Sequence, residues 1–333
     1  MPSLREIRQR IKGTKNMAKI TQAMQMVASS KMRRVQERVE QARPYSEQLR
    51  DLVSRLANAS NGDLENELAL LKQRSVRNIG IILVTPDRGL CGALPSNINR
   101  YAALTAQQQL EASGSHTTFK DGGQMHSVPI QPSKDGEPNA FQNAFQDAIM
   151  IEEGHHPGIS YIGVGRKGRD FIVRTQQNLI AEFTNYGDRP SMNDASAIAQ
   201  VAVDAFLKCE IDLVFLIYAK FINTVTQQPT AVQLLPVKPP TEQSASSRST
   251  DYIYEPGPRE IFHALLPRYV DVQVYQALLE AVASEQSAKM VAMKNATDNA
   301  NELVQDLTLT YNKARQAAIT TQILEVVAGA EAL

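Results

Sequence analysis

Residues 268–328 contain neither glycine nor proline, and no other feature constrains the fold of this chain as strongly. At about 1.5 Å per residue, one helix over this stretch would be roughly 90 Å long, far more than a compact domain needs. Residues 1–43 are similar, because Pro2 and Gly13 are the only helix breakers among them. We therefore expect two long helices, one from each end of the chain, that pair as a shaft.

The N-terminal stretch carries apolar residues on two helical faces. The first set is Leu4, Ile7, Ile11, Ala18, Met32, Val35 and Val39, and the second, offset set is Met17, Ile20, Met24 and Val27. A helix with two apolar faces needs two partners, which we expect to be a sister helix and an enclosing wall. Pro44 is expected to kink this helix rather than end it, since the helical pattern continues to Leu56.

The C-terminal stretch carries an alanine-rich seam that lets two helices approach closely. Its residues are Leu278, Ala281, Val282, Ala288, Val291, Ala292, Leu303, Leu307, Ala314, Ala318, Ile323 and Val326. The two helices pair in antiparallel fashion if both leave the same side of the domain between them.

The middle of the chain alternates between strand and helix patterns, which favours a mostly parallel sheet with helices on its faces. The expected strands are 78–85, 160–164, 179–183, 212–219 and 231–237, and the expected helices run from about 94 to 110 and from a cap at 191–194 to 209. The predicted fold class is α/β: a long antiparallel coiled coil plus a central Rossmann-like domain.

Three segments follow from these patterns: an N-terminal helix over 1–60, a central domain over 75–238 and a C-terminal helix over 256–333. Within the central domain, residues 113–158 are rich in Gly, Pro, Ser and His and are expected to form a largely irregular insertion. Residues 239–250 are expected to form a flexible connection.

The charge balance is even, with 35 Lys and Arg against 35 Asp and Glu, so it gives no reason to expect a nucleic-acid partner. The basic residues are nevertheless concentrated, because residues 7–36 contain eight cations and no acid. Such a block indicates a partner surface or a solvated face. Cys91 and Cys209, far apart in sequence, favour a reducing compartment. The start of the chain lacks an apolar signal core and no stretch approaches ~20 apolar residues, so we expect a cytosolic chain.

One motif suggests a nucleotide site. Gly163, Gly165 and Gly168 fit the dinucleotide pattern GxGxxG after a strand, and Glu182 lies near the expected acidic position. The preceding strand is short and follows an irregular insertion, however, so a plain tight turn is the favoured interpretation. We predict no catalytic residue, no cofactor and no metal site: Cys91 in Asp87–Gly92 lacks a neighbouring base, and the histidines lack ligand spacing.

Seven segments in order resemble the γ subunit of the F-type ATP synthase, in its bacterial form. They are Ile7–Ile11, Lys15–Met32, Arg43–Tyr45, Asp87–Gly92, Lys220–Thr224, Ser284–Asn299 and Tyr311–Ala330. They cover both helical stretches and most of the middle, and leave out mainly residues 113–158.

The resemblance implies a central rotor shaft that couples proton-driven rotation of the c-ring to conformational cycling of the catalytic β subunits. The implied partners are the α and β subunits, the ε subunit and the c-ring. The implied location is the cytoplasmic side of the cell inner membrane, peripheral and held through the complex. In this family the catalytic sites lie on other subunits.

The resemblance also implies roles for particular residues. Lys289, Gln316 and Thr320 fall where family members contact the catch loops of β, although the family usually has Arg at the first position. Met24 falls at the contact with the β lever, and Tyr252 and Glu255 fall in the foot that meets the c-ring. The implied apolar bearing tip contains Ile319, Ile323, Val326 and Val327.

Two other functions remain open from sequence. The first is a nucleotide-binding Rossmann enzyme that uses Gly163–Gly168, with the long helices as a dimerising coiled coil. The second is a homo-oligomeric coiled-coil scaffold. Nucleotide binding by the isolated chain would favour the enzyme. Stable self-association of the isolated chain would favour the scaffold.

Overall fold

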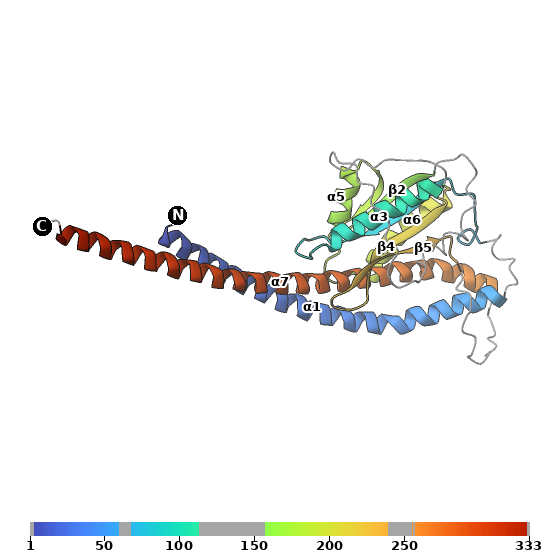
Figure 1. The fold of residues 1–333 in the computed structure, drawn as a ribbon. Helices are drawn as coiled ribbons and strands as arrows, with labels where there is room; N and C mark the ends of the chain where they lie inside the picture. Colours follow the sequence, from blue (N-terminus) through green and yellow to red (C-terminus); the bar gives the residue numbers. More distant parts are fainter. Residues whose placement is uncertain (1–2, 60–67, 113–156, 239–254, 256, 332–333) are drawn as a thin grey trace. The chain divides into compact units, whose positions relative to one another are not determined.

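A computed structural model describes residues 3–59, 68–112, 157–238, 255 and 257–331 (Figure 1). The elements in chain order are α1 (Leu4–Ala59), β1 (Asn78–Val84), α3 (Leu94–Ala112), β2 (Gly158–Val164), α5 (Arg166–Arg174), β3 (Asn178–Phe183), α6 (Met192–Leu207), β4 (Leu213–Phe221), β5 (Gln227–Leu235) and α7 (Pro258–Glu331). The two terminal helices have 56 and 74 residues, which confirms the long helices expected from the sequence.

Packing divides the chain into two compact units. The first unit comprises Met1–Met32, Leu90–Gly92 and Gln286–Leu333, and the second comprises Arg33–Gly89 and Ala93–Glu285. Each long helix therefore contributes to both units. The boundaries of the three segments expected from sequence fall near the ends of the helices, whereas the boundaries of the compact units fall within them. The three-segment organisation therefore stays a prediction.

The second unit is built on a five-stranded sheet in the order β3-β2-β1-β4-β5. The first four strands are parallel, and β5 runs antiparallel to β4. Six of the seven residues of β1 are buried, as expected of a central strand covered on both faces. This topology confirms the mostly parallel sheet, and all five strands overlap the apolar runs that predicted them. The strand β5 begins at Gln227, four residues before the predicted start. Gly158, assigned from sequence to the insertion, begins β2.

The helix α6 begins where its sequence signal predicted. Ser191 accepts a hydrogen bond from the backbone N–H of Asp194, and the Asp194 carboxylate accepts one from the backbone N–H of Ser191. This capping box satisfies two donors that would otherwise lack partners. The helix α5 was not predicted, because its sequence RKGRDFIVR begins with charged residues and glycine.

Both long helices take part in the core of the second unit. Val53 and Leu56 of α1 join Phe262, Leu266 and other apolar residues of α7 in the main buried cluster with the sheet. The Ser284 hydroxyl donates to the carbonyl of Ala219 in β4 at 2.9 Å. Pro44 lies inside α1, so the helix continues past it as expected.

The first unit is an antiparallel two-helix coiled coil. Arg8 contacts Tyr311, and further along Thr21 contacts Thr297, so numbers rise on one helix as they fall on the other. Buried and half-buried positions alternate three and four residues apart on both helices. On α1 the repeat runs through Leu4, Ile7, Ile11, Thr14, Ala18, Thr21, Gln25, Ala28 and Met32, and on α7 it runs through Met293, Thr297, Ala300, Val304, Leu307, Tyr311, Ala314 and Ala318. This seven-residue repeat defines a left-handed supercoil.

The seam differs from the sequence prediction at several positions. Leu303, Ile323 and Val326 were expected inside but are 49%, 58% and 72% exposed. Val304 lies in the seam instead of its neighbour Leu303. Thr21 and Thr297 are buried and share a hydrogen bond of 2.7 Å between their hydroxyls. Polar residues therefore occupy seam positions that the spacing of apolar residues alone does not predict.

Candidate bearing surface on the paired helices

The coiled coil buries only one of the two apolar faces of α1. The second face, predicted from sequence, points outward: Met17, Ile20 and Val27 are each 55% exposed, and Met24 is half-buried. Met26 is also exposed, at 64%, but it lies about half a turn around the helix from Met17 and so does not belong to this face. Large apolar side chains gathered on one exposed face mark a surface that a partner covers.

The C-terminal end of α7 carries the second exposed apolar group. The residues expected to form the tip, Ile319, Ile323, Val326 and Val327, are 47–72% exposed, and Leu324 adds another exposed side chain. They follow Ala318, the last seam position described above. In Figure 1 this end of α7 continues past the start of α1. The tip side chains therefore have no sister helix to pack against.

Gln316 and Thr320 lie one turn apart on α7, and both are exposed. The Thr320 hydroxyl donates to the backbone carbonyl of Gln316 at 3.0 Å, which fixes its orientation on the helix. The side-chain amide of Gln316 projects from the exposed face. Lys289 is half-buried on the same helix but lies 27 positions earlier, a separation of about 40 Å along the axis. The structure does not bring these three residues into one cluster.

The basic residues of α1 border this surface. Arg10, Lys12, Lys15 and Lys19 are exposed. Arg8 instead holds the two helices together: its Nη2 donates to the Tyr311 hydroxyl at 2.7 Å, and its guanidinium carbon lies 5.5 Å from the Tyr311 ring centroid. The sequence did not predict this pair, whose only signal is that Tyr311 occupies a seam position.

The glycine motif at Gly163–Gly168 does not form a nucleotide site. The N–H groups at the start of α5 already have partners: Arg166 donates to the Asp87 carboxylate at 3.0 Å, Lys167 to the Pro86 carbonyl at 3.3 Å, and Gly168 to the Thr85 hydroxyl at 2.7 Å. The Asp87 carboxylate occupies the place where a phosphate would bind a helix N-terminus.

The remaining motif residues also have structural roles. Glu182, which would contact a ribose in a dinucleotide site, pairs with Arg169 at 2.6 Å. Gly165 has φ +92°, and a Cβ added there would lie 2.0 Å from the Thr85 carbonyl oxygen. The tight turn favoured from sequence is therefore what the structure contains, followed by the short helix α5.

Other candidate residues add no chemical site. Cys91 is buried. The Asp87 carboxylate, which accepts from Arg166, accepts a second hydrogen bond from the backbone N–H of Asn185 at 3.0 Å. The described part of the chain holds no group of three or more metal-ligating side chains. None of its helices combines the length and apolarity needed to cross a bilayer. Glu255 is exposed, and Tyr252 lies outside the described residues.

A coiled coil with an exposed apolar face beside its buried seam defines a class of subunit whose surface other chains complete. The ATP synthase family model matches residues 3–128 and 137–333. The ATP synthase gamma chain of Roseiflexus castenholzii is 43% identical over 333 residues, covering 100% of this chain and 99% of that one. The gamma chain of Dehalococcoides mccartyi strain CBDB1 is 42% identical, with 100% of each chain covered. The chain belongs to the ATP synthase gamma chain family.

Solved structures share the fold at low identity. A chain in the Euglena gracilis mitochondrial ATP synthase, OSCP/F1/c-ring in rotational state 3, aligns with a TM-score of 0.58 at 16% identity, covering 99% of this chain and 94% of that chain. The rotor of the same assembly in rotational state 1 gives a TM-score of 0.53 at 19% identity, with 95% and 98% covered. Both likenesses agree with the predicted fold class.

Proposed function

We propose that this chain is the central rotor shaft of an F-type ATP synthase, and that it couples rotation of a c-ring to conformational cycling of catalytic β subunits. The observation that carries the proposal is the second apolar face of α1 together with the exposed tip of α7. The first lies beside a seam that is already complete and the second lies beyond it, so no described residue of this chain covers either surface.

The proposed partners are the α and β subunits around the coiled coil, the ε subunit and the c-ring. Because the helix pair presents different residues in different directions, its orientation stabilises one conformer of each surrounding β subunit over another. A shaft with such differential contacts shifts the populations of conformers as it turns. The exposed cations Arg10, Lys12, Lys15 and Lys19 add a charge-dependent attraction to acidic loops.

Individual roles are part of the same proposal. Gln316 and Thr320 meet one catch loop of β, and Lys289, about 40 Å away along α7, meets another. Met24 packs against the β lever, and Ile319, Ile323, Val326 and Val327 turn in an apolar sleeve. Tyr252 and Glu255 contribute to the foot on the c-ring.

The chain itself carries out no chemistry in this proposal, and the catalytic sites lie on other subunits. Its membrane association is peripheral, through the assembled complex at the cytoplasmic side of the cell inner membrane. A pull-down of the tagged full chain from native membranes tests the assembly: recovery of α and β subunits supports the proposal, and their absence contradicts it.

Replacing Gln316 and Thr320 together with Ala tests the contact roles. We expect ATP synthesis driven by a proton gradient to fall several-fold, while nucleotide stays bound to the ring. Asp306→Ala with Thr310→Ala is the matched control, because the Thr310 hydroxyl donates to the Asp306 carbonyl just as Thr320 does to Gln316. Unchanged synthesis in the first variant, or an equal loss in the control, would count against the assigned roles.

A further inference from the structure

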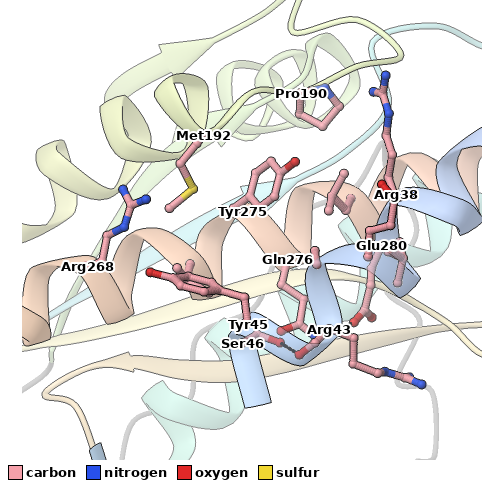
Figure 2. Close-up of a pocket in the computed structure, with 15 residues that line it drawn as sticks. Arg38, Arg43, Tyr45, Ser46, Pro190, Met192, Arg268, Tyr275, Gln276 and Glu280 are labelled. Carbon is pink, nitrogen blue, oxygen red and sulfur yellow. Dashed lines mark hydrogen bonds between the residues drawn. The ribbon is translucent and has the colours of Figure 1, made fainter. Parts of the chain in front are cut away.

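The second unit contains a groove to which none of the roles proposed above is assigned. It encloses about 540 Å³ and lies between residues 38–46 of α1, the start of α6 and residues 268–280 of α7 (Figure 2). This volume falls within the range of small-molecule sites in proteins. All of its walls belong to one compact unit.

The middle of the groove is aromatic and apolar. Tyr45 of α1 and Tyr275 of α7 enter it from two helices, and Met192 and Pro190 close it from the side of α6 (Figure 2). Tyr45 remains 50% exposed although it lies against this apolar wall. Flat aromatic faces with a polarisable thioether suit a planar apolar body.

The ends of the groove are cationic. Arg268, near Met192, and Arg38 lie toward opposite ends of the groove in Figure 2. Neither guanidinium has an acidic partner within 4 Å among the residues that the structure describes. Arg43, the third arginine, differs because its Nε lies 3.9 Å from the Glu47 carboxylate. Two guanidinium groups are therefore available to bind anions, and their planar donor geometry suits carboxylate or phosphate.

Glu280 forms part of the floor, and it does not cancel these charges. Its side chain is buried, Oε1 accepts from Gln276 at 3.2 Å, and Oε2 has no hydrogen-bond partner. Burial raises the pKa of this carboxyl, while Gln276, Lys220 and Arg43 oppose the rise. The residues that line the groove include three arginines and a single carboxylate, so the lining carries a net positive charge.

We propose that this groove binds an elongated small dianion with a planar apolar body, such as an aromatic dicarboxylate. The apolar body lies between Tyr45 and Tyr275, one acidic group contacts Arg268 and the other contacts Arg38. Such a ligand matches an aromatic centre flanked by two guanidinium groups that have no acidic partner within 4 Å among the described residues. A neutral planar molecule would leave both arginines without partners.

Calorimetric titration of the full-length chain tests the proposal with three probes of one shape: 2,6-naphthalenedicarboxylate, 2-naphthoate and neutral 2,6-naphthalenedicarboxamide. We expect saturable binding of one dicarboxylate per chain, roughly tenfold tighter than the monocarboxylate because one charged hydrogen-bonded contact is lost. The diamide should bind weakest.

Two variants and a control complete the test. Arg268→Gln and Arg38→Gln should each weaken dicarboxylate binding roughly tenfold, to the level of the monocarboxylate. Arg34→Gln changes an exposed arginine of α1 outside the groove and should leave the affinity unchanged. Thermal unfolding verifies that each variant is folded. Equal affinity for diamide and dicarboxylate, no effect of either groove variant, or no saturable binding at millimolar concentration would overturn the proposal.

Discussion

Gly165 shows how a motif typical of nucleotide binding serves packing in this chain. Its neighbour across the turn is the Thr85 carbonyl, and the Thr85 hydroxyl donates to the Val164 carbonyl at 3.1 Å and accepts from Gly168 N–H. A side chain at residue 165 would enter this buried network. The two glycines allow β1 and α5 to approach closely, which is a structural reason for the pattern GVGRKG.

Replacing Gly165 with Ala should destabilise the protein by about 3 kcal/mol or more, because positive φ strain adds to a forced displacement of the Thr85 backbone. Gly187→Ala is the matched control: its φ is +68°, yet no atom lies within 4 Å of the added Cβ. The control should cost about 1–2 kcal/mol through backbone strain alone. Denaturant unfolding of the two variants compares them, and equal losses would contradict the role of the Thr85 contact.

Glu280 should make stability depend on pH in a defined direction. Burial raises its folded-state pKa above the ordinary 4.5, so the folded chain holds this proton over a window where the unfolded chain has lost it. Stability from this group therefore falls as pH rises from the unfolded pKa through the folded pKa, and is level above it.

The variant Glu280→Gln stays neutral and escapes this loss. Its unfolding free energy relative to the original chain should rise across the window that begins near 4.5 and extends upward. Denaturant unfolding of both proteins at a series of pH values measures the difference. A constant difference across the series would contradict the assignment to Glu280.

At the scale of elements, the sequence predicts well wherever burial is apolar and periodic. All five strands and both long helices follow from β-branched runs or from long stretches without breakers. The helix α5 could not be found this way, because only Gly168 and Ile172 of its nine residues are buried and its first turn is charged. The seam positions Thr21 and Thr297 were missed because they are polar. Their hydroxyls share one hydrogen bond, and backbone carbonyls within reach of each accept the proton that this bond leaves over.

The seam of the coiled coil should tolerate no larger side chain at its small positions. Ala28 is 1% exposed, so Ala28→Leu should push the helices apart and destabilise the coiled coil by about 1–3 kcal/mol. Ala23 is exposed on the same helix, and Ala23→Leu should change stability by less than about 0.5 kcal/mol. Amide hydrogen exchange along α1 measures both. Equal protection in the two variants would argue against close packing at Ala28.

At the scale of the whole molecule, the exposed tip should matter for assembly but not for folding. Ile323, Val326 and Val327 are exposed, so replacing all three with Ser should change unfolding by only about 0.5–1 kcal/mol. Copurification of the α and β subunits should nevertheless decrease. Gln322→Ser, an exposed polar change in the same segment, serves as the control. Full recovery of α and β with the apolar tip removed would contradict the bearing role.

The candidate site was less predictable than the fold for a physical reason. Lys289, Gln316 and Met24 do not converge on a cavity among the described residues, and in the function proposed above each contributes to a surface that another chain completes. Burial and hydrogen bonding within one chain therefore cannot distinguish them from other exposed or half-buried residues. The assigned roles came from the resemblance, whereas the exposed second face of α1 was predicted from periodicity alone.

The seven-residue repeat of the coiled coil has a mechanical consequence. Because the supercoil is left-handed, torque in one direction winds the two helices more tightly around each other. Torque in the other direction unwinds them. Winding presses Ala18 and Ala28 harder against the opposite helix, whereas unwinding strains the hydroxyl pair of Thr21 and Thr297. The paired helices should therefore be stiffer for one sense of twist than for the other.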